Sequence, residues 1–196
     1  MDDLVDYITR GEEARDLEYK ESQPWDALKG KIARTAMAMA NLRGGGAIVI
    51  GVAERLGAIA PVGMTPEHTR SYNGDDVRAF INSFADPYIE ARLRPVEHDG
   101  KQFLLIVVDE FDEIPCLSKK ASQPDGILEG RMYVRSGRMF ETTEVRTHHD
   151  LREVLNLATE KSLAATLGLL ERTGVSIERL RAAGAGAEYD RELEGL

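Results

Sequence analysis

The stretch AIVIGV, residues 47–52, decides the fold because it is short and apolar throughout. Such a strand is typical of a sheet that is covered on both faces. Upstream, a helical pattern ends near Asn41 and is followed by the glycines at 44–46, which favour a helix stop and a tight turn. The apolar residues of this helix recur every three or four positions and form one buried stripe: Trp25, Leu28, Ile32, Ala36 and Met39.

Other strands are predicted from alternating or apolar runs. DLEYK, residues 16–20, alternates apolar and charged side chains, as do residues 89–94, whereas residues 103–108 are apolar on both faces. The turn His98-Asp99-Gly100 predicts that residues 89–108 form a hairpin. A second helix is expected after the capping residues Asp75 and Asp76. The predicted fold class is α+β, with a mixed, largely antiparallel sheet packed against helices.

Composition narrows the possible functions. The 196 residues, 42% of them hydrophobic, suffice for one sizeable core. The net charge of −9 argues against a general nucleic-acid coat, although it leaves room for a local basic surface. No run approaches the roughly 18 apolar residues of a membrane span. The N-terminal MDDLVDYITRGEE is acidic, unlike a secretory signal, so we expect a cytoplasmic protein with no membrane partner.

Two kinds of ligand site are not expected. The glycines at 44–46 follow a helix and precede a strand, which is the reverse of a dinucleotide fingerprint, and Gly30-Lys31 is followed by Ile32 rather than Ser or Thr. A nucleotide cofactor is therefore unsupported. Cys116 is the only cysteine, and the four histidines lack ligand spacing, so neither a disulfide nor a zinc site is predicted.

A basic strand is the first candidate for nucleic-acid contact. In RMYVR, residues 131–135, alternation places Arg131, Tyr133 and Arg135 on one face, with Arg138 shortly after. Guanidinium groups beside an aromatic ring suit phosphate contact and base stacking. An ordinary solvated face with arginine–carboxylate pairs fits the pattern equally well. The predicted nucleic-acid-binding residues are Arg131, Tyr133, Arg135, Arg138, Arg92, Arg94 and Arg43.

The helix that carries the stripe from Trp25 to Met39 gives less support to the prediction of nucleic-acid contact. Lys29 and Lys31 flank its buried stripe on opposite sides, while Arg34 points away. No single basic stripe is therefore expected on it.

Carboxylates form the second candidate site. If residues 16–20 pair beside residues 47–52, Glu13, Glu18 and Glu54 could converge near Lys20. Three carboxylates could hold Mg²⁺ or Mn²⁺ and activate water for phosphodiester cleavage. The alternative is that Glu18 pairs with Lys20 and the other acids are structural or surface charge.

Taken together, several motifs resemble one family, the Schlafen-type Alba-like domain, over about residues 11–150. They occur in the family's order: GEEARDLEYKES, AMAMANLRGGG, AIVIGVAE, DGKQFLLIVV, IPC and GRMYVRSGR. The resemblance implies an α+β domain, which we place at residues 1–150, whose sheet presents a nucleic-acid surface. The apolar pattern that follows predicts a helical tail over residues 151–196. The family often accompanies transcription regulators, and its animal members include endoribonucleases.

In those nucleases an acidic triad and a lysine are catalytic, which by motif would be Glu13, Glu18, Glu54 and Lys20. Glu54 stands where the family has Asp, and this chain holds one lobe where the nucleases have two. A homodimer could supply the second lobe. The apolar tail could either pack on the chain's own sheet or cover a second copy, and we expect a homodimer: the side chains are Leu151, Val154, Leu155, Leu157, Leu163, Leu167, Leu169 and Leu170. The last fifteen residues are expected to be weakly structured.

Three functions follow as hypotheses. The first is a nucleic-acid-binding module, DNA-binding and regulatory, that needs no cofactor for binding. The second is an endoribonuclease that depends on Mg²⁺ or Mn²⁺ and acts on structured RNA. The third is an oligomerisation or protein-interaction domain, which the acidic charge favours.

Overall fold

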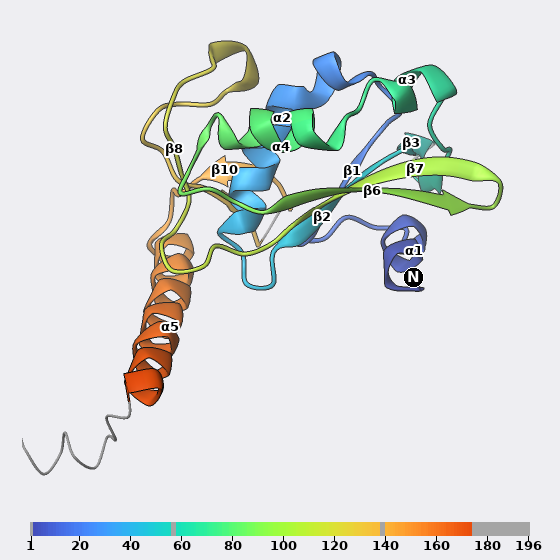
Figure 1. The fold of residues 1–196 in the computed structure, drawn as a ribbon. Coiled ribbons are helices and arrows are strands. Elements are labelled where there is room, and N and C mark those ends of the chain that lie inside the picture. The colour runs from blue at the N-terminus through green and yellow to red at the C-terminus, as the bar shows by residue number, and fades with distance from the viewer. Residues whose placement is uncertain (1, 56–57, 138–139, 174–196) are drawn as a thin grey trace, which may run out of the picture. The chain divides into compact units, whose positions relative to one another are not determined.

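The computed structural model describes residues 2–55, 58–137 and 140–173 and is built on a four-stranded sheet (Figure 1). Its strand order is β1-β2-β7-β6, with bounds Leu17–Lys20, Gly46–Ile50, Lys101–Val108 and Ala91–His98. β1 runs parallel to β2, and the two other pairings are antiparallel. The predicted α+β fold with a mixed, largely antiparallel sheet is confirmed.

Helices cover both faces of this sheet, as the apolar β2 predicted. On one face lie α2 (Trp25–Ala40) and α4 (Gly74–Asn82), and on the other lies α1 (Asp2–Thr9) (Figure 1). Every residue of β2 is buried, because Ile48 and Ile50 join the core under α2 while Ala47 and Val49 join the core on the α1 side. The predicted stripe of α2 faces the first of these cores.

The turn after α2 depends on close packing against β7. Asn41 caps the helix, and Gly44 and Gly45 follow with φ of 79° and 72°. A Cβ at Gly45 would lie 2.1 Å from the backbone oxygen of Val108, so a side chain has no room there. The buried amide of Asn41 also accepts from the N–H of Cys116 and donates to two backbone carbonyls, which ties the IPC motif to this helix end.

The predicted hairpin of residues 89–108 is confirmed as β6 and β7. Asp99 and Gly100 form its turn with φ of 50° and 70°. The cap of α4 differs from the prediction: the side chain of Asn73, rather than Asp75 or Asp76, accepts the first backbone N–H groups of the helix.

Smaller elements complete the described chain. Three two-stranded ribbons pair β3 (Val52–Arg55) with β4 (Ala58–Pro61), β5 (Ala85–Asp86) with β8 (Leu117–Ser118), and β9 (Tyr133–Arg135) with β10 (Thr142–Glu144). Short helices are α3 (Pro66–Arg70) and the 3₁₀ turn η1 (Gln123–Asp125). The strand predicted at residues 131–135 is thus shorter than expected and, among the strands of the described chain, pairs with β10 alone.

The last described helix, α5, comprises His148–Thr173. By internal contacts the chain divides into a unit of residues 1–157 and a second unit that begins at Ala158. Val154 and Leu157 are buried in the first unit, whereas Leu151 and Leu155 are exposed. The predicted break at Gly174 and the last fifteen residues lie outside the described part. No helix of the described chain has the length and apolar character to cross a membrane.

Candidate nucleic-acid interface

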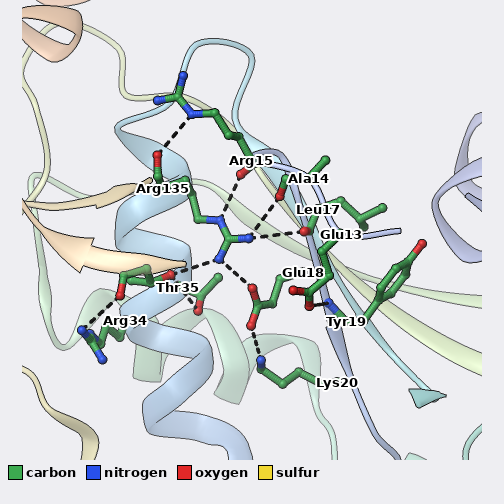
Figure 2. Close-up of polar contacts among 11 residues, drawn as sticks. Glu13, Ala14, Arg15, Leu17, Glu18, Tyr19, Lys20, Arg34, Thr35 and Arg135 are labelled. Atoms are coloured by element: carbon green, nitrogen blue, oxygen red, sulfur yellow. Dashed lines mark hydrogen bonds and ion pairs between the residues drawn. The ribbon is translucent and has the colours of Figure 1, made fainter. Parts of the chain in front are cut away.

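Arg135 lies in the interior, with 1% of its side chain exposed (Figure 2). Its Nη1 donates to Glu18 Oε2 at 2.6 Å and to the Thr142 hydroxyl at 3.3 Å. The other N–H groups donate to backbone carbonyls between β1 and the segment before it, namely those of Ala14, Arg15 and Leu17 at 3.0–3.3 Å. All five N–H groups of the guanidinium therefore have acceptors, so this side chain joins β9 to β1.

The prediction that Tyr133 and Arg135 lie on an exposed face of β9 is wrong. Tyr133 is fully buried, where its hydroxyl accepts the Leu128 N–H at 2.8 Å and donates to the Gly126 carbonyl at 3.2 Å. Val134, on the opposite side of the strand, is also buried. Since β9 packs against α2 and is covered on both sides, Tyr133 and Arg135 have no surface with which to contact a nucleic acid.

A second arginine extends this network to α5. Arg15 Nε donates to the backbone oxygen of Arg135 at 3.2 Å, so each arginine binds the backbone of the other (Figure 2). The remaining nitrogens of Arg15 bind both oxygens of Glu153, at 2.7 and 3.2 Å. The hydrogen bond from Arg15 outweighs the opposing effect of burial and lowers the pKa of Glu153.

The predicted acidic triad does not converge. Glu18 Oε2 is held by Arg135 and Oε1 by Lys20, while Glu13 accepts the backbone N–H of Tyr19 at 3.2 Å (Figure 2). Glu54 is exposed on β3 and lines a different hollow, of about 800 Å³, which Glu13 also lines. Although β1 and β2 pair as expected, Glu18 projects toward α2, whereas Glu54 lies beyond the end of β2.

These carboxylates do not fit the Mg²⁺ or Mn²⁺ that the resemblance implies. Both oxygens of Glu18 already bind cationic side chains. Within residues 2–55, 58–137 and 140–173, no three His, Cys, Asp or Glu side chains are grouped so as to hold a metal ion. The ion pair of Glu18 with Lys20, the alternative left open by the sequence, is what the structure contains.

A polar cleft of about 620 Å³ lies beside this network, between β1, α2, η1 and β10. Its cations are Lys20, Lys31, Arg34 and Arg146, and its carboxylates are Glu13, Glu18, Asp125 and Glu141. Lys20 pairs with Glu18, and Asp125 accepts a hydrogen bond from the Ser122 hydroxyl at 2.5 Å. The other three cations form no ion pair within the described residues. Of the carboxylates, Glu13 and Glu141 likewise form no ion pair among the described residues.

Lys31 and Arg34 line this cleft together, because residues three apart on a helix are neighbours. The prediction that α2 has no basic stripe is therefore wrong on this side. Lys29 does lie elsewhere: its ammonium is 2.7 Å from Asp26 and 5.5 Å from the ring centroid of Phe80. Sequence reasoning missed the pair because it did not consider the i, i+3 spacing of Lys31 and Arg34.

Arg34 is held in place without a carboxylate. One Nη donates to the backbone oxygen of Thr142 at 3.1 Å, and the guanidinium carbon lies 5.3 Å from the ring centroid of Tyr133. Its Nε is buried and has no hydrogen-bond partner among the described residues. Gly126, with φ of 64°, lies beside the other Nη, which a Cβ there would contact at 3.5 Å. Tyr133 thus supports a cation instead of stacking a base.

The other predicted basic residues do not form one surface with the cleft. Arg92 and Arg94 are exposed on β6, which is the opposite edge of the sheet from β1. Arg92 binds both oxygens of Asp109 at 2.7 and 2.5 Å. Arg131 is exposed, 3.8 Å from Glu144, and Arg43 is exposed beside the glycine turn. Arg138 lies outside the described residues.

Comparison with known proteins identifies the domain. The DIP2311 protein of Corynebacterium diphtheriae is 20% identical with a TM-score of 0.48, over 71% of this chain but only 23% of that chain. The N-terminal domain of a RecG-related protein from Nitrosomonas europaea is 23% identical with a TM-score of 0.44, over 75% of this chain and 97% of that one. Comparison with curated proteins finds none that matches. The family model described as Schlafen, AlbA_2 matches residues 13–144, from Glu13 at the cleft through all of β10. The chain therefore belongs to the Schlafen, AlbA_2 family.

Proposed function

We propose that this chain binds nucleic acid and that the cleft beside α2 contacts the phosphate backbone. The observation that carries the proposal is the set of Lys31, Arg34 and Arg146, which line one cleft and form no ion pair in the part of the chain described. Cations elsewhere are often neutralised, as in the pairs of Arg78 with Asp75 and Arg92 with Asp109. Unpaired cations in a hollow attract an external anion even when the net charge is −9.

The buried network keeps the cleft from becoming strongly acidic. Glu18 lines the cleft, but it is bound by both Arg135 and Lys20 and so contributes little net negative charge. Three phosphate contacts would give a slope of log affinity against log salt of about −2 for a single strand and about −3 for duplex DNA. Such binding is salt-sensitive and modest, as suits a module that acts beside other domains or as a dimer.

The placement of the carboxylates supports a binding role over that of a metal-dependent ribonuclease, and we propose that this binding is DNA-binding and regulatory. A metal-dependent nuclease needs carboxylates whose oxygens are available to the ion. Here Glu18 is engaged by two cations, and Glu54 lines a separate hollow. The cleft also holds Lys31, Arg34 and Arg146, none in an ion pair among the described residues, and such cations hold phosphates without hydrolysing them.

Anisotropy of labelled DNA and RNA over a salt series tests the proposal. The variant Lys31→Ala with Arg146→Ala removes two cleft cations, and Lys29→Ala with Arg78→Ala removes two paired cations elsewhere, so the two proteins have the same net charge. For a single strand, the cleft variant should lower the salt slope by about 1.4, and the control should match the wild type. Absence of salt-dependent binding, or equal behaviour of the two variants, would reject the proposal.

We also propose that the chain forms a homodimer through α5, as a second function. The supporting observation is the exposure of large apolar side chains on this helix: Leu151 41%, Leu155 51%, Leu163 58%, Leu167 37% and Leu169 54%. Light scattering tests it, since a mass near 21.7 kDa rejects a dimer and twice that mass supports one. Replacing Leu163 and Leu167 with Gln should return the mass to that of a monomer.

A further inference from the structure

Phe140 is an exposed aromatic residue at the edge of the cleft. It lies in the loop between β9 and β10, with 39% of its surface exposed and φ of 52°. Its side chain lines both the 620 Å³ cleft and the 800 Å³ hollow beside it. A bulky residue at positive φ is uncommon, and 39% of this residue remains in contact with solvent, so Phe140 is not part of either hydrophobic core.

We propose that Phe140 is a stacking platform for an unpaired base, so that the cleft takes single-stranded nucleic acid in preference to duplex. This inference rests on the proposed nucleic-acid binding and names its substrate class. Stacking needs a base whose face is accessible, and in a duplex both faces are covered by neighbouring base pairs. The two hollows that Phe140 lines have volumes in the range of small-molecule sites, about 300–1,000 Å³, which suits individual nucleotides.

The cations of the cleft are suitably arranged for this mode of binding. Lys31, Arg34 and Arg146 line the same hollow as Phe140, so phosphates and a base can be held together. Proteins that bind single strands combine a basic groove with aromatic rings in this way. Tyr133, the aromatic residue first assigned to stacking, is buried under Arg34 and cannot take the role.

Hydrogen bonds hold the backbone of Phe140 and Glu141 to the residue that follows β9. Phe140 N–H donates to the Ser136 carbonyl at 3.2 Å, and Ser136 N–H donates to the Glu141 carbonyl at 2.8 Å. Directly behind these residues, Arg135 is paired in register with Thr142 and fixed to Glu18. A ring on a backbone held in this way loses less conformational entropy on binding than a mobile one.

Four variants and two ligands test the inference by anisotropy: a labelled single strand, and the duplex of the same sequence. Phe140→Ala should weaken single-strand binding about 5- to 150-fold, the range for loss of one base–aromatic stack. Phe140→Leu, which keeps apolar area but no ring, should weaken it similarly, whereas Phe140→Trp should retain it. Tyr88→Ala is the matched control, because Tyr88 is 57% exposed and does not line the cleft. Duplex affinity should be the same in all of them.

A second readout is the fluorescence of 2-aminopurine in the single strand, which should be quenched by the wild type and by Phe140→Trp but not by Phe140→Leu. The salt slope should not change, because Phe140 carries no charge. If the wild type binds with the expected slope but Phe140→Ala and Phe140→Leu bind equally well, the stacking inference is overturned and the proposed function stands. If the wild type binds neither ligand, both are overturned. Thermal unfolding of Phe140→Ala equal to that of the wild type establishes that any loss is one of binding.

Discussion

Replacing Arg135 with alanine should strongly destabilise the fold, although this arginine looks like a surface residue in the sequence. The change removes five hydrogen bonds and leaves Glu18, whose side chain is 14% exposed, with Lys20 as its remaining cation. Removing one partner of a buried ion pair typically costs about 3–5 kcal/mol. For a unit of residues 1–157 this corresponds to a fall in Tm of about 6–20 °C.

Urea unfolding followed by circular dichroism measures this loss, and Arg131→Ala is the matched control. Arg131 lies four residues earlier in the same segment, but its side chain is 60% exposed and 3.8 Å from Glu144. An exposed pair of this kind contributes about 0–1 kcal/mol. Arg135→Lys should fall between the two, because an ammonium keeps the charge but supplies only three donors. Equal stability of Arg135→Ala and Arg131→Ala would refute the structural role assigned to the buried guanidinium.

Three further predictions concern other parts of the fold. The pKa of Glu153 is lowered by the hydrogen bond from Arg15, so this pair stabilises the protein above the ordinary glutamate pKa of about 4.3, and the contribution is lost as the pH falls through the lower folded-state value. In Glu153→Gln the free energy of unfolding in urea should therefore depend less on pH in this acid range, and an unchanged pH profile would contradict the assignment. Gly45→Ala should destabilise far more than Gly44→Ala, because both have positive φ but only Gly45 lies against the backbone of β7; equal melting temperatures would show that the close approach is unimportant. Burial raises the pKa of the Cys116 thiol to about 12, so a thiol reagent at pH 8 should label the urea-unfolded chain but not the native one; rapid native labelling would show that the thiol is accessible.

Local patterns determined most of the main fold. The apolar run at residues 47–52 predicted a strand covered on both sides, and the stripe from Trp25 to Met39 predicted a helix ending near Asn41; both are confirmed. The hairpin of β6 and β7 followed from alternation and its turn residues. These predictions hold because hydrophobic periodicity and turn chemistry act between residues that are close in the chain.

The burial and the partners of the site residues could not be predicted from the sequence, because tertiary packing determines both. Alternation along residues 131–135 placed Tyr133 and Arg135 on one face correctly, but it carried no information on what covers that face. In the structure α2 and β1 cover this face. A buried guanidinium is costly unless it is paired with an opposite charge, and Glu18 supplies that charge. The identity of that partner, 117 residues away, follows from the packing of a strand that, among the strands of the described chain, pairs with β10 alone.

The same reason explains the cleft and the carboxylates. Lys31, Arg34, Phe140 and Arg146 come from α2 and from segments more than a hundred residues later, and they share a hollow only because β10 packs on α2. Glu18 on β1 and Glu54 on β3 belong to strands in contact, yet Glu18 lines the cleft beside α2 and Glu54 lines a separate hollow. Residue types and spacing determined which elements form. The packing of elements distant in sequence decided which charges are buried in pairs and which remain open, because that packing sets the solvent exposure and the partner of each charge.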